Sequence, residues 1–392
     1  MEETYICGVR SAETEENTSD LKLPEGIPPL HSLYLYLSDS CNLRCRHCWI
    51  TPTYVNGKPS SGEVINPDLL LNIVREAKTL GLKNAKFTGG EPMLHPNFRK
   101  IAKTLTDEGL NLIMETNGTL IDSEIARFLK NETSISFISI SLDSADEKTH
   151  DAFRGSIGAY RDALDGLKHL TESGYKNVQL IMSPHRGNVD GVKALAELAA
   201  DRGAASVKLN PVTNNGRGAA MHTNDETLHF DEVMDLYNYV RGELKSEVKI
   251  PVILNVPLSV RPLSEITSPR GFNGDCGIDH IIGILGSGDI ALCGIGRTMP
   301  KFVYGNIAND SICDIWINHP SVNKLRYDLN DFKNYPDLCR SCIFIKRCRT
   351  GCVVQNYSDY GKLIWPNNIC LEAQELGLFK ESRKRTVHGK GA

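Results

Sequence analysis

The stretch Leu33-Tyr-Leu-Tyr-Leu-Ser-Asp-Ser-Cys41-Asn-Leu-Arg-Cys45-Arg-His-Cys48 joins an apolar run to three closely spaced cysteines. The apolar run is typical of a buried strand, and similar runs recur along the chain between segments with helical apolar spacing. The strand candidates are 33–37, 84–88, 111–115, 137–141, 178–182 and 206–210, and the helix candidates are 67–80, 97–109, 122–130, 158–173, 188–203 and 228–246. This alternation predicts an α/β fold with a parallel sheet, either open and doubly wound or curled into a barrel.

The composition of the 392-residue chain excludes several classes of partner. Its formal net charge is −4 and its pI is near 6.3, which argues against nucleic acid or an anionic membrane as a partner. The N-terminus lacks the cationic start and apolar run of a signal peptide. No apolar stretch reaches the roughly 18–20 residues that a membrane-spanning helix requires. We therefore expect a soluble, cytoplasmic protein.

The character of the sequence changes near residue 250. Regular strand–helix alternation stops there, and the remainder carries many glycines and eight of the twelve cysteines. That composition is typical of a small domain built around metal centres. We expect four parts, namely a loosely packed lead-in over 1–33, the α/β unit over 34–250, a small metal-binding domain over 251–380 and a basic tail over 381–392.

The first three cysteines predict a metal site. Thiols stay reduced in the cytoplasm, where closely spaced cysteines indicate metal ligands. Cys41, Cys45 and Cys48 can bind three of the irons of a [4Fe–4S] cube and leave the last iron open to a small molecule. Structural zinc is the alternative, with His47 as a candidate fourth ligand. Zinc sites usually pair two CxxC segments, and His47 is crowded between its neighbours, so we favour the cluster.

Several motifs in this order resemble those of a known family. Cys41-x3-Cys45-x2-Cys48, with His47 at the aromatic position, resembles the CxxxCxφC signature of radical S-adenosylmethionine (SAM) enzymes. Thr88-Gly-Gly-Glu-Pro92 resembles that family's GGEP motif, and Glu115-Thr-Asn-Gly118 resembles its TNG turn. The resemblance covers roughly residues 34–225. It implies a partial (βα)6 TIM-like barrel and not an open sheet.

The resemblance also implies where SAM binds. The motifs follow successive predicted strands, and ligands of α/β folds bind at the carboxyl ends of strands. A turn or capping role explains each residue singly, but their succession at strand ends favours a common ligand. The residues that we expect to bind SAM are His47, Gly89, Gly90, Glu91, Pro92, Thr116, Asn117, Ser141, Asp143, Arg154 and Leu209.

Seven later cysteines resemble the SPASM extension of one branch of radical SAM enzymes, which implies two auxiliary [4Fe–4S] clusters. Structural zinc is again the alternative. The resemblance assigns one cluster to Cys339, Cys342, Cys348 and Cys370, and the other to Cys276, Cys293 and Cys352.

The cluster at Cys276, Cys293 and Cys352 lacks an evident fourth ligand. Either its last iron is open to substrate, or Cys313 completes it. We favour the open iron, because Cys313 falls in a connecting segment where a small buried cysteine is the simpler interpretation.

The resemblance implies reductive cleavage of SAM to a 5′-deoxyadenosyl radical that modifies a ribosomally made precursor peptide by crosslinking, epimerisation or backbone excision. The alternatives are a formylglycine-type (sulfatase) maturase and a non-catalytic iron–sulfur electron carrier, although a carrier has no use for the motif at Gly89–Pro92. The expected cofactors are SAM and three [4Fe–4S] clusters. The expected partners are the precursor peptide, a separate small leader-binding protein and an external electron donor of the flavodoxin or ferredoxin type.

Overall fold

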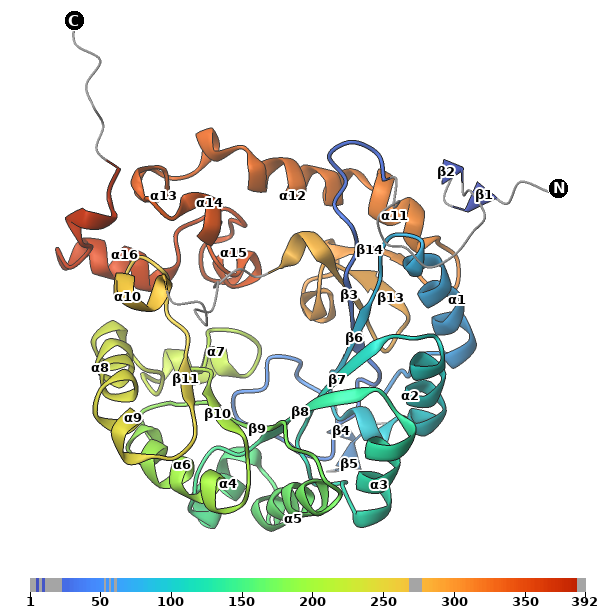
Figure 1. Cartoon of the computed structure of the whole chain (residues 1–392). Coiled ribbons are helices and arrows are strands. Elements are labelled where there is room, and N and C mark those ends of the chain that lie inside the picture. The colour runs from blue at the N-terminus through green and yellow to red at the C-terminus, as the bar shows by residue number, and fades with distance from the viewer. Residues whose placement is uncertain are drawn as a thin grey trace, which may run out of the picture.

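A mixed, ten-stranded sheet curls through the protein, and Figure 1 shows helices packed around its outer side. This computed structural model describes residues 23–52, 62–267 and 277–385, and the backbone of 5–6, 9–10, 54–55 and 58–59. The order of strands across the sheet is β11-β10-β9-β8-β7-β6-β3-β12-β13-β14. The run from β3 to β11 is parallel, as the predicted barrel requires.

The six predicted strands are all present, within two residues at each end. The parallel strands are β3 (Ser32–Tyr36), β6 (Asn84–Thr88), β7 (Asn111–Thr116), β8 (Ile135–Ser141), β9 (Val178–Met182), β10 (Ser206–Leu209) and β11 (Val252–Leu254). β11 was not predicted, and it extends the parallel sheet beyond residue 250 by pairing with β10. Two separate hairpins are formed by β1 (Tyr5–Ile6) with β2 (Val9–Arg10), and by β4 (Tyr54–Val55) with β5 (Lys58–Pro59).

The helices of the barrel also follow the prediction. They are α1 (Pro67–Lys78), α2 (Phe98–Asp107), α3 (Ser123–Glu132), α4 (Glu147–Arg154), α5 (Ala159–Glu172), α6 (Val192–Asp201), α7 (Gly218–Thr223), α8 (Phe230–Arg241) and α9 (Glu243–Glu247). The sequence prediction missed α4 and α7. Asn66 begins α1 by accepting the backbone N–H groups of Asp68 and Leu69, and Asp122 begins α3 by accepting that of Ile125.

The C-terminal part joins the same sheet. Its strands are β12 (Ile281–Ile284), β13 (Asp289–Ala291) and β14 (Val303–Asn306), and its helices are α10 (Leu263–Ile266), α11 (Ile312–Asn318), α12 (Pro320–Asn330), α13 (Asp337–Ser341), α14 (Ile345–Cys348), α15 (Val353–Tyr360) and α16 (Asn368–Glu375). β12 pairs in parallel with β3, and β13 and β14 continue antiparallel from it. The cysteine-rich segment is therefore built onto the edge of the barrel at β3.

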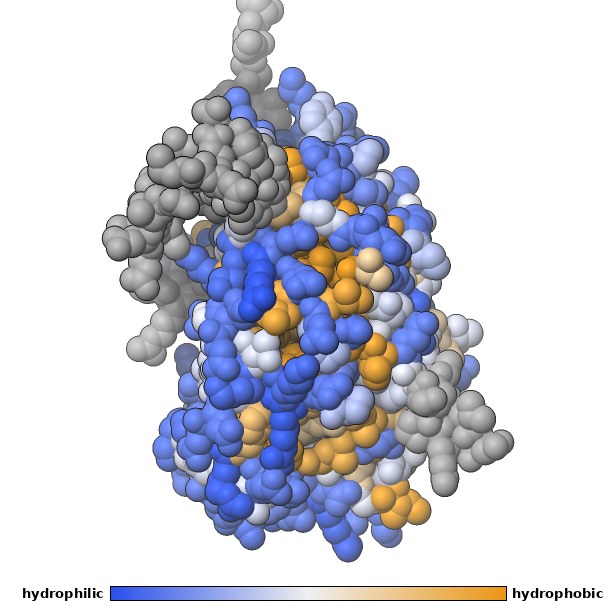
Figure 2. All heavy atoms as spheres, turned by 90° about the vertical axis from the view of Figure 1, so that its right-hand side faces the viewer, coloured by the Kyte–Doolittle hydropathy of each residue, from blue (hydrophilic) through white to orange (hydrophobic). Residues whose placement is uncertain are grey.

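Alternation along β3 explains how the sheet acquires two faces. Leu33 and Leu35 are fully buried in the core that the sheet forms with the outer helices. Tyr34 and Tyr36 therefore point to the inner face, because successive side chains of a strand point to opposite sides. The outer surface over α1, α2 and α3 is mostly hydrophilic, with apolar side chains in small groups (Figure 2). Among the described helices, none combines the length and apolarity needed to cross a bilayer.

Candidate functional site

The three cysteines of the first loop lie together just beyond the carboxyl end of β3. Cys41 and Cys45 are buried, Cys48 is half-buried, and all three line one cavity of about 340 Å³. Burial, and after it the neighbouring Cys45, raises the pKa of the Cys41 thiol to about 12. Thiolates this close in a buried loop are costly unless a cation shares them, so the loop fits an iron–sulfur cluster.

Most of the predicted SAM contacts line the same cavity. They are His47, Gly89, Gly90, Thr116, Asn117, Ser141 and Arg154. The side chains of Glu91, Pro92, Asp143 and Leu209 do not line it. Residues outside the predicted list of SAM contacts also line it, among them Thr88, Glu115, Ser139, Ile181 and Asn210. Their signal was their position, because they lie on or directly after the strands that carry the motifs.

The two glycines of the GGEP motif let β6 approach the cysteine loop. A Cβ on Gly90 would lie 2.0 Å from the carbonyl oxygen of Ser40, and Gly89 has φ +117°. The Gly90 N–H donates to the Ser38 carbonyl across 3.1 Å. Only glycine allows this contact, which holds the residues before Cys41 against the end of β6.

Glu91 ties neighbouring strand ends together. Its carboxylate is fully buried and accepts hydrogen bonds from the Thr116 hydroxyl at 2.8 Å and from the Asn117 N–H at 2.9 Å. Burial raises the pKa of Glu91 to about 7, against these hydrogen bonds, which lower it. The residue therefore positions Thr116 and Asn117, which line the cavity, and does not reach the cavity itself.

Asp143 and Arg154 form a buried ion pair under the cysteine loop. Arg154 Nε donates to Asp143 Oδ2 across 2.5 Å, and Arg154 Nη1 donates to the sulfur of Cys45 at 3.6 Å. Asp143 Oδ1 accepts the Ser183 N–H. Burial alone would raise the pKa of Asp143, but Arg154 holds it below its ordinary value. Arg154 therefore connects the fourth strand end to the cysteine loop, and Asp143 holds it there.

His47 is the outer member of a stack of three rings. Its ring lies 4.6 Å from that of Phe153, at an interplanar angle of 6°. On the other side, Phe153 stacks on His185 at 4.5 Å. Burial, assisted by the charge of Arg154, lowers the pKa of His47 to about 3. The cavity wall at this point is therefore a neutral aromatic ring at physiological pH.

Four C-terminal cysteines converge on a second cavity. Cys339, Cys342, Cys348 and Cys370 all line it, together with Ser259, whose hydroxyl lies 3.1 Å from the sulfur of Cys370. Burial, and after it the neighbouring Cys348, raises the pKa of Cys339 to about 12. Four thiols facing one apolar space fit the ligand set of a fully coordinated cluster.

Cys293 and Cys352 form a separate pair. Burial raises the pKa of Cys293 to about 12, and Cys352 is near enough to contribute to the rise. Cys276 lies outside the described residues. Cys313 is buried in α11, and its sulfur lies 3.5 Å from the hydroxyl of Thr79 and 3.7 Å from the carbonyl of Glu76 in the α1 region.

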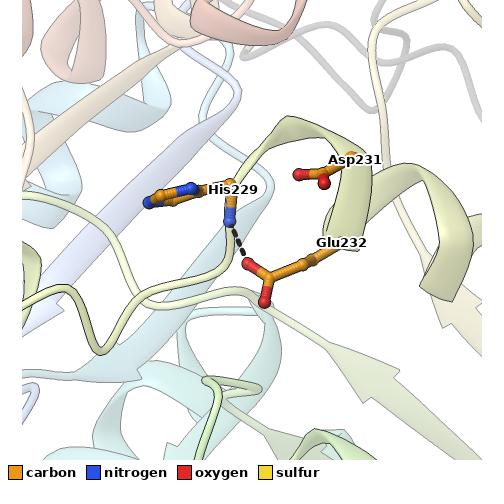
Figure 3. A group of neighbouring side chains, drawn as sticks. All are labelled: His229, Asp231 and Glu232. Atoms are coloured by element: carbon orange, nitrogen blue, oxygen red, sulfur yellow. Dashed lines mark hydrogen bonds between the residues drawn. The ribbon is translucent and has the colours of Figure 1, made fainter.

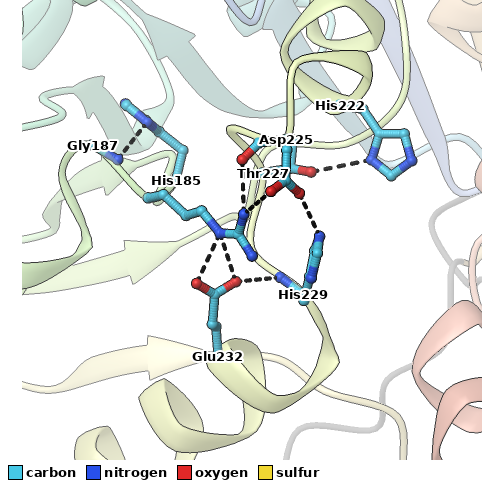
Figure 4. A network of polar contacts seen from close by, with 8 residues as sticks. His185, Gly187, His222, Asp225, Thr227, His229 and Glu232 are labelled. Carbon is cyan, nitrogen blue, oxygen red and sulfur yellow. Dashed lines mark hydrogen bonds and ion pairs between the residues drawn. The ribbon is translucent and has the colours of Figure 1, made fainter.

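A cluster of polar side chains around the start of α8 resembles a metal site but has a structural role. His229, Asp231 and Glu232 lie close enough to share an ion (Figure 3). Glu232, however, accepts the backbone N–H of His229 as the cap of α8 and also pairs with Arg186. Asp225 pairs with both Arg186 and His229 (Figure 4). The two carboxylates thus share the Arg186 guanidinium, and Glu232 also caps α8, which gives the network a structural role.

Comparison with known proteins agrees with this geometry. Residues 35–199 match the family described as Radical SAM superfamily, and residues 276–343 match the SPASM family, described as an iron-sulfur cluster-binding domain. The Fe-coproporphyrin III synthase of Methanosarcina barkeri is 32% identical, over 87% of this chain and 88% of its own length. The chain therefore belongs to the radical SAM superfamily. Within it, the chain is a radical SAM enzyme of the branch that carries a SPASM domain.

Two further relatives are peptide-related by name. The subtilosin biosynthesis protein AlbA of Bacillus subtilis is 28% identical, over 76% of this chain and 61% of its own length. The mycofactocin maturase MftC of Mycobacterium ulcerans is 26% identical, over 91% of this chain and 93% of its own length. The crystal structure of Streptococcus suis SuiB with its precursor peptide SuiA has a TM-score of 0.66 at 18% identity, and it covers 88% of this chain and 76% of SuiB. At that identity the likeness to SuiB concerns the fold.

Proposed function

We propose that this protein is a radical SAM maturase that modifies a ribosomally made precursor peptide by crosslinking, epimerisation or backbone excision. The observation that carries the proposal is the single cavity that Cys41, Cys45 and Cys48 share with Gly89, Gly90 and the strand-end polar residues. Bound SAM, cleaved reductively at the cluster, supplies a 5′-deoxyadenosyl radical that abstracts a hydrogen atom from the substrate. The relatives AlbA and MftC support a peptide as the substrate.

The chain's own residues would hold and shield the reacting groups. Gly89 and Gly90 keep the end of β6 against the cysteine loop. Backbone carbonyls there can accept hydrogen bonds from the ammonium group of SAM. Ser139 and Ser141 provide hydroxyls at the end of β8, suited to a ribose. His47 provides a neutral aromatic wall. Together these walls exclude water from the place where the radical forms.

The C-terminal cysteines support two auxiliary [4Fe–4S] clusters. The convergence of Cys339, Cys342, Cys348 and Cys370 supports a closed cluster, and Cys293 with Cys352 supports a second one that Cys276 would complete to three ligands. The sulfur of Cys313 is disulfide-bonded and lies against the α1 region, which supports an open iron in this second cluster. We also propose an external flavodoxin or ferredoxin as electron donor and a separate small leader-binding protein.

The decisive experiment for the proposal is anaerobic reconstitution with iron and sulfide, followed by SAM and a strong reductant. We expect 5′-deoxyadenosine from the wild type and none from Cys45→Ala. Precursor candidates are then added one at a time, and their masses are compared before and after reaction. If competently reconstituted wild-type protein forms no 5′-deoxyadenosine, the radical chemistry is refuted.

A second candidate substrate is a tetrapyrrole. The specific observation that favours it is the 32% identity to Fe-coproporphyrin III synthase over most of both chains. Incubating the reconstituted enzyme with a panel of iron tetrapyrroles, and comparing the products by chromatography with an iron coproporphyrin III standard, separates the two candidates. A modified tetrapyrrole, with no change in any precursor peptide, would overturn the peptide assignment.

A further inference from the structure

Lys208 is a charged residue between two apolar residues of β10. In β10, Val207 and Leu209 are buried in the core between sheet and helices. Lys208 lies between them and must therefore point to the inner face. Its register partner on β9 is Ile181, which lines the SAM cavity.

Lys208 has no counter-ion in the described part of the chain. No carboxylate there lies within ion-pair distance of its ammonium group, and no described residue accepts a hydrogen bond from it. The lysine is half-buried, and burial lowers its pKa, with the Lys86 ammonium acting in the same direction and Glu115 against it. Lys86 and Glu115 are thus the described charged groups that act on Lys208 from other strands of the sheet.

The charge of Glu115 is already balanced by Lys86. Lys86 Nζ donates to Glu115 Oε1 across 2.7 Å, and the Thr88 hydroxyl donates to Oε2 across 3.1 Å. The ammonium of Lys86 also lies 4.6 Å from the centroid of the Tyr34 ring. Arg154, the other cation of the cavity wall, is balanced by Asp143. Among the described side chains that face inward from β6, β7 and β10, Lys208 is therefore the charged one without an ion-pair partner.

We propose that Lys208 forms a carboxylate-binding subsite on the inner face of the barrel, next to the part of the cavity that Ile181 lines. An ammonium group held in a partly desolvated space favours an anionic partner strongly, because its attraction is weakly screened there. The subsite would place a carboxylate of the substrate beside the position where the hydrogen atom is abstracted. The inference rests on the proposed function for the source of the carboxylate. That source is an aspartate, a glutamate or the C-terminus of the peptide substrate.

The test measures the accessibility of Lys208 in the wild-type holoenzyme with SAM bound. Brief acetylation with acetic anhydride, read by mass spectrometry, is performed with the capped tripeptide acetyl-Gly-Asp-Gly-amide or with its asparagine counterpart, each at saturating concentration. We expect the acidic peptide to slow acetylation of Lys208 about tenfold, which corresponds to about 1.4 kcal/mol, and the neutral peptide to leave it unchanged. The exposed Lys176 is the internal control. Equal effects of the two peptides, or no effect of either, would overturn the proposal.

A third arm identifies the source of the carboxylate. Coproporphyrin III replaces the tripeptide in the same assay, and its affinity is also measured by fluorescence quenching in wild type, Lys208→Met and Lys176→Met. Protection by the acidic peptide supports the inference as stated. Protection of Lys208 by the porphyrin alone, with a porphyrin affinity that falls in Lys208→Met and is kept in Lys176→Met, overturns the peptide source while retaining the carboxylate subsite. Formation of 5′-deoxyadenosine by the wild type is scored separately, so a failure of the radical chemistry is distinguishable from a failure of the subsite.

Discussion

Replacing Asp143 by asparagine tests whether the buried pair with Arg154 supports the cysteine loop. The side chains of Arg154 and Asp143 are 7% and 1% exposed. Asparagine keeps the shape but removes the charge, and its amide nitrogen would face a donor, either Arg154 Nε or the Ser183 N–H. Because removing one partner of a buried pair leaves the other charge uncompensated, we expect the free energy of unfolding to fall by about 3–5 kcal/mol.

The matched control for Asp143→Asn is an ion pair in the same region that solvent reaches. Glu147 pairs with Arg161, and their side chains are 36% and 73% exposed. Glu147→Gln should therefore cost less than about 1 kcal/mol. Both variants are unfolded in urea under anaerobic conditions and followed by circular dichroism. A loss in Asp143→Asn no larger than the loss in Glu147→Gln would refute the reasoning.

Three further predictions concern the strand ends and the cysteines. Gly90→Ala should lower the free energy of unfolding by about 1–3 kcal/mol or more and reduce iron incorporation, because the added Cβ would overlap the Ser40 carbonyl. Gly191→Ala is the control and should be tolerated, because a Cβ there would have nothing within 4 Å. Equal iron content in the two variants would contradict the prediction. The pKa of Glu91 is raised from 4.5 to about 7, so the folded state binds the proton more tightly than the unfolded state does, and the free energy of unfolding should fall by about 3 kcal/mol as pH rises between these values. Urea unfolding of Glu91→Gln at several pH values should lack this pH dependence. An unchanged pH dependence in the variant would count against the prediction. Cys370→Ala should disrupt the closed auxiliary cluster and lower the iron content by up to about four atoms per chain. Cys313→Ala should keep its iron. A colorimetric iron assay measures both, and iron loss in Cys313→Ala would assign Cys313 as a ligand.

The strands of the barrel were predictable because each is a short apolar run, as expected for strands buried between other layers. The helix α4 was not, because its buried residues include His150, Asp151 and Arg154 and so make no apolar stripe. Its first turn is capped by Asp146, a signal that the sequence does carry but that apolar periodicity does not weigh. β11 spans only Val252–Leu254, which is too short to show a period.

The motifs of the site were predictable from the sequence. Which motif residues line the cavity, and which hold those residues in place, was not. Glu91 and Asp143 belong to the motifs, yet the structure places both behind the cavity wall, where they hold Thr116 and Arg154. A motif gives the residues that occur together and does not say which of them face the ligand. Hydrogen-bond partners from other strands decide that, and these partners are far away in sequence.

The sequence alone determined the class of chemistry, because three cysteines within eight residues can share a metal cluster whatever surrounds them, and the motifs then follow in a fixed order along successive strands. Only the tertiary structure decided how the inner space of the barrel is charged. Lys86, Glu115 and Lys208 come from three different strands, β6, β7 and β10, which are far apart in the sequence. Curling the sheet turns their side chains toward the inside of the barrel, where Lys86 neutralises Glu115 and Lys208 has no counter-ion among the described residues. Charge balance in a cavity depends on distances across the barrel, and those distances are set by how the strands close.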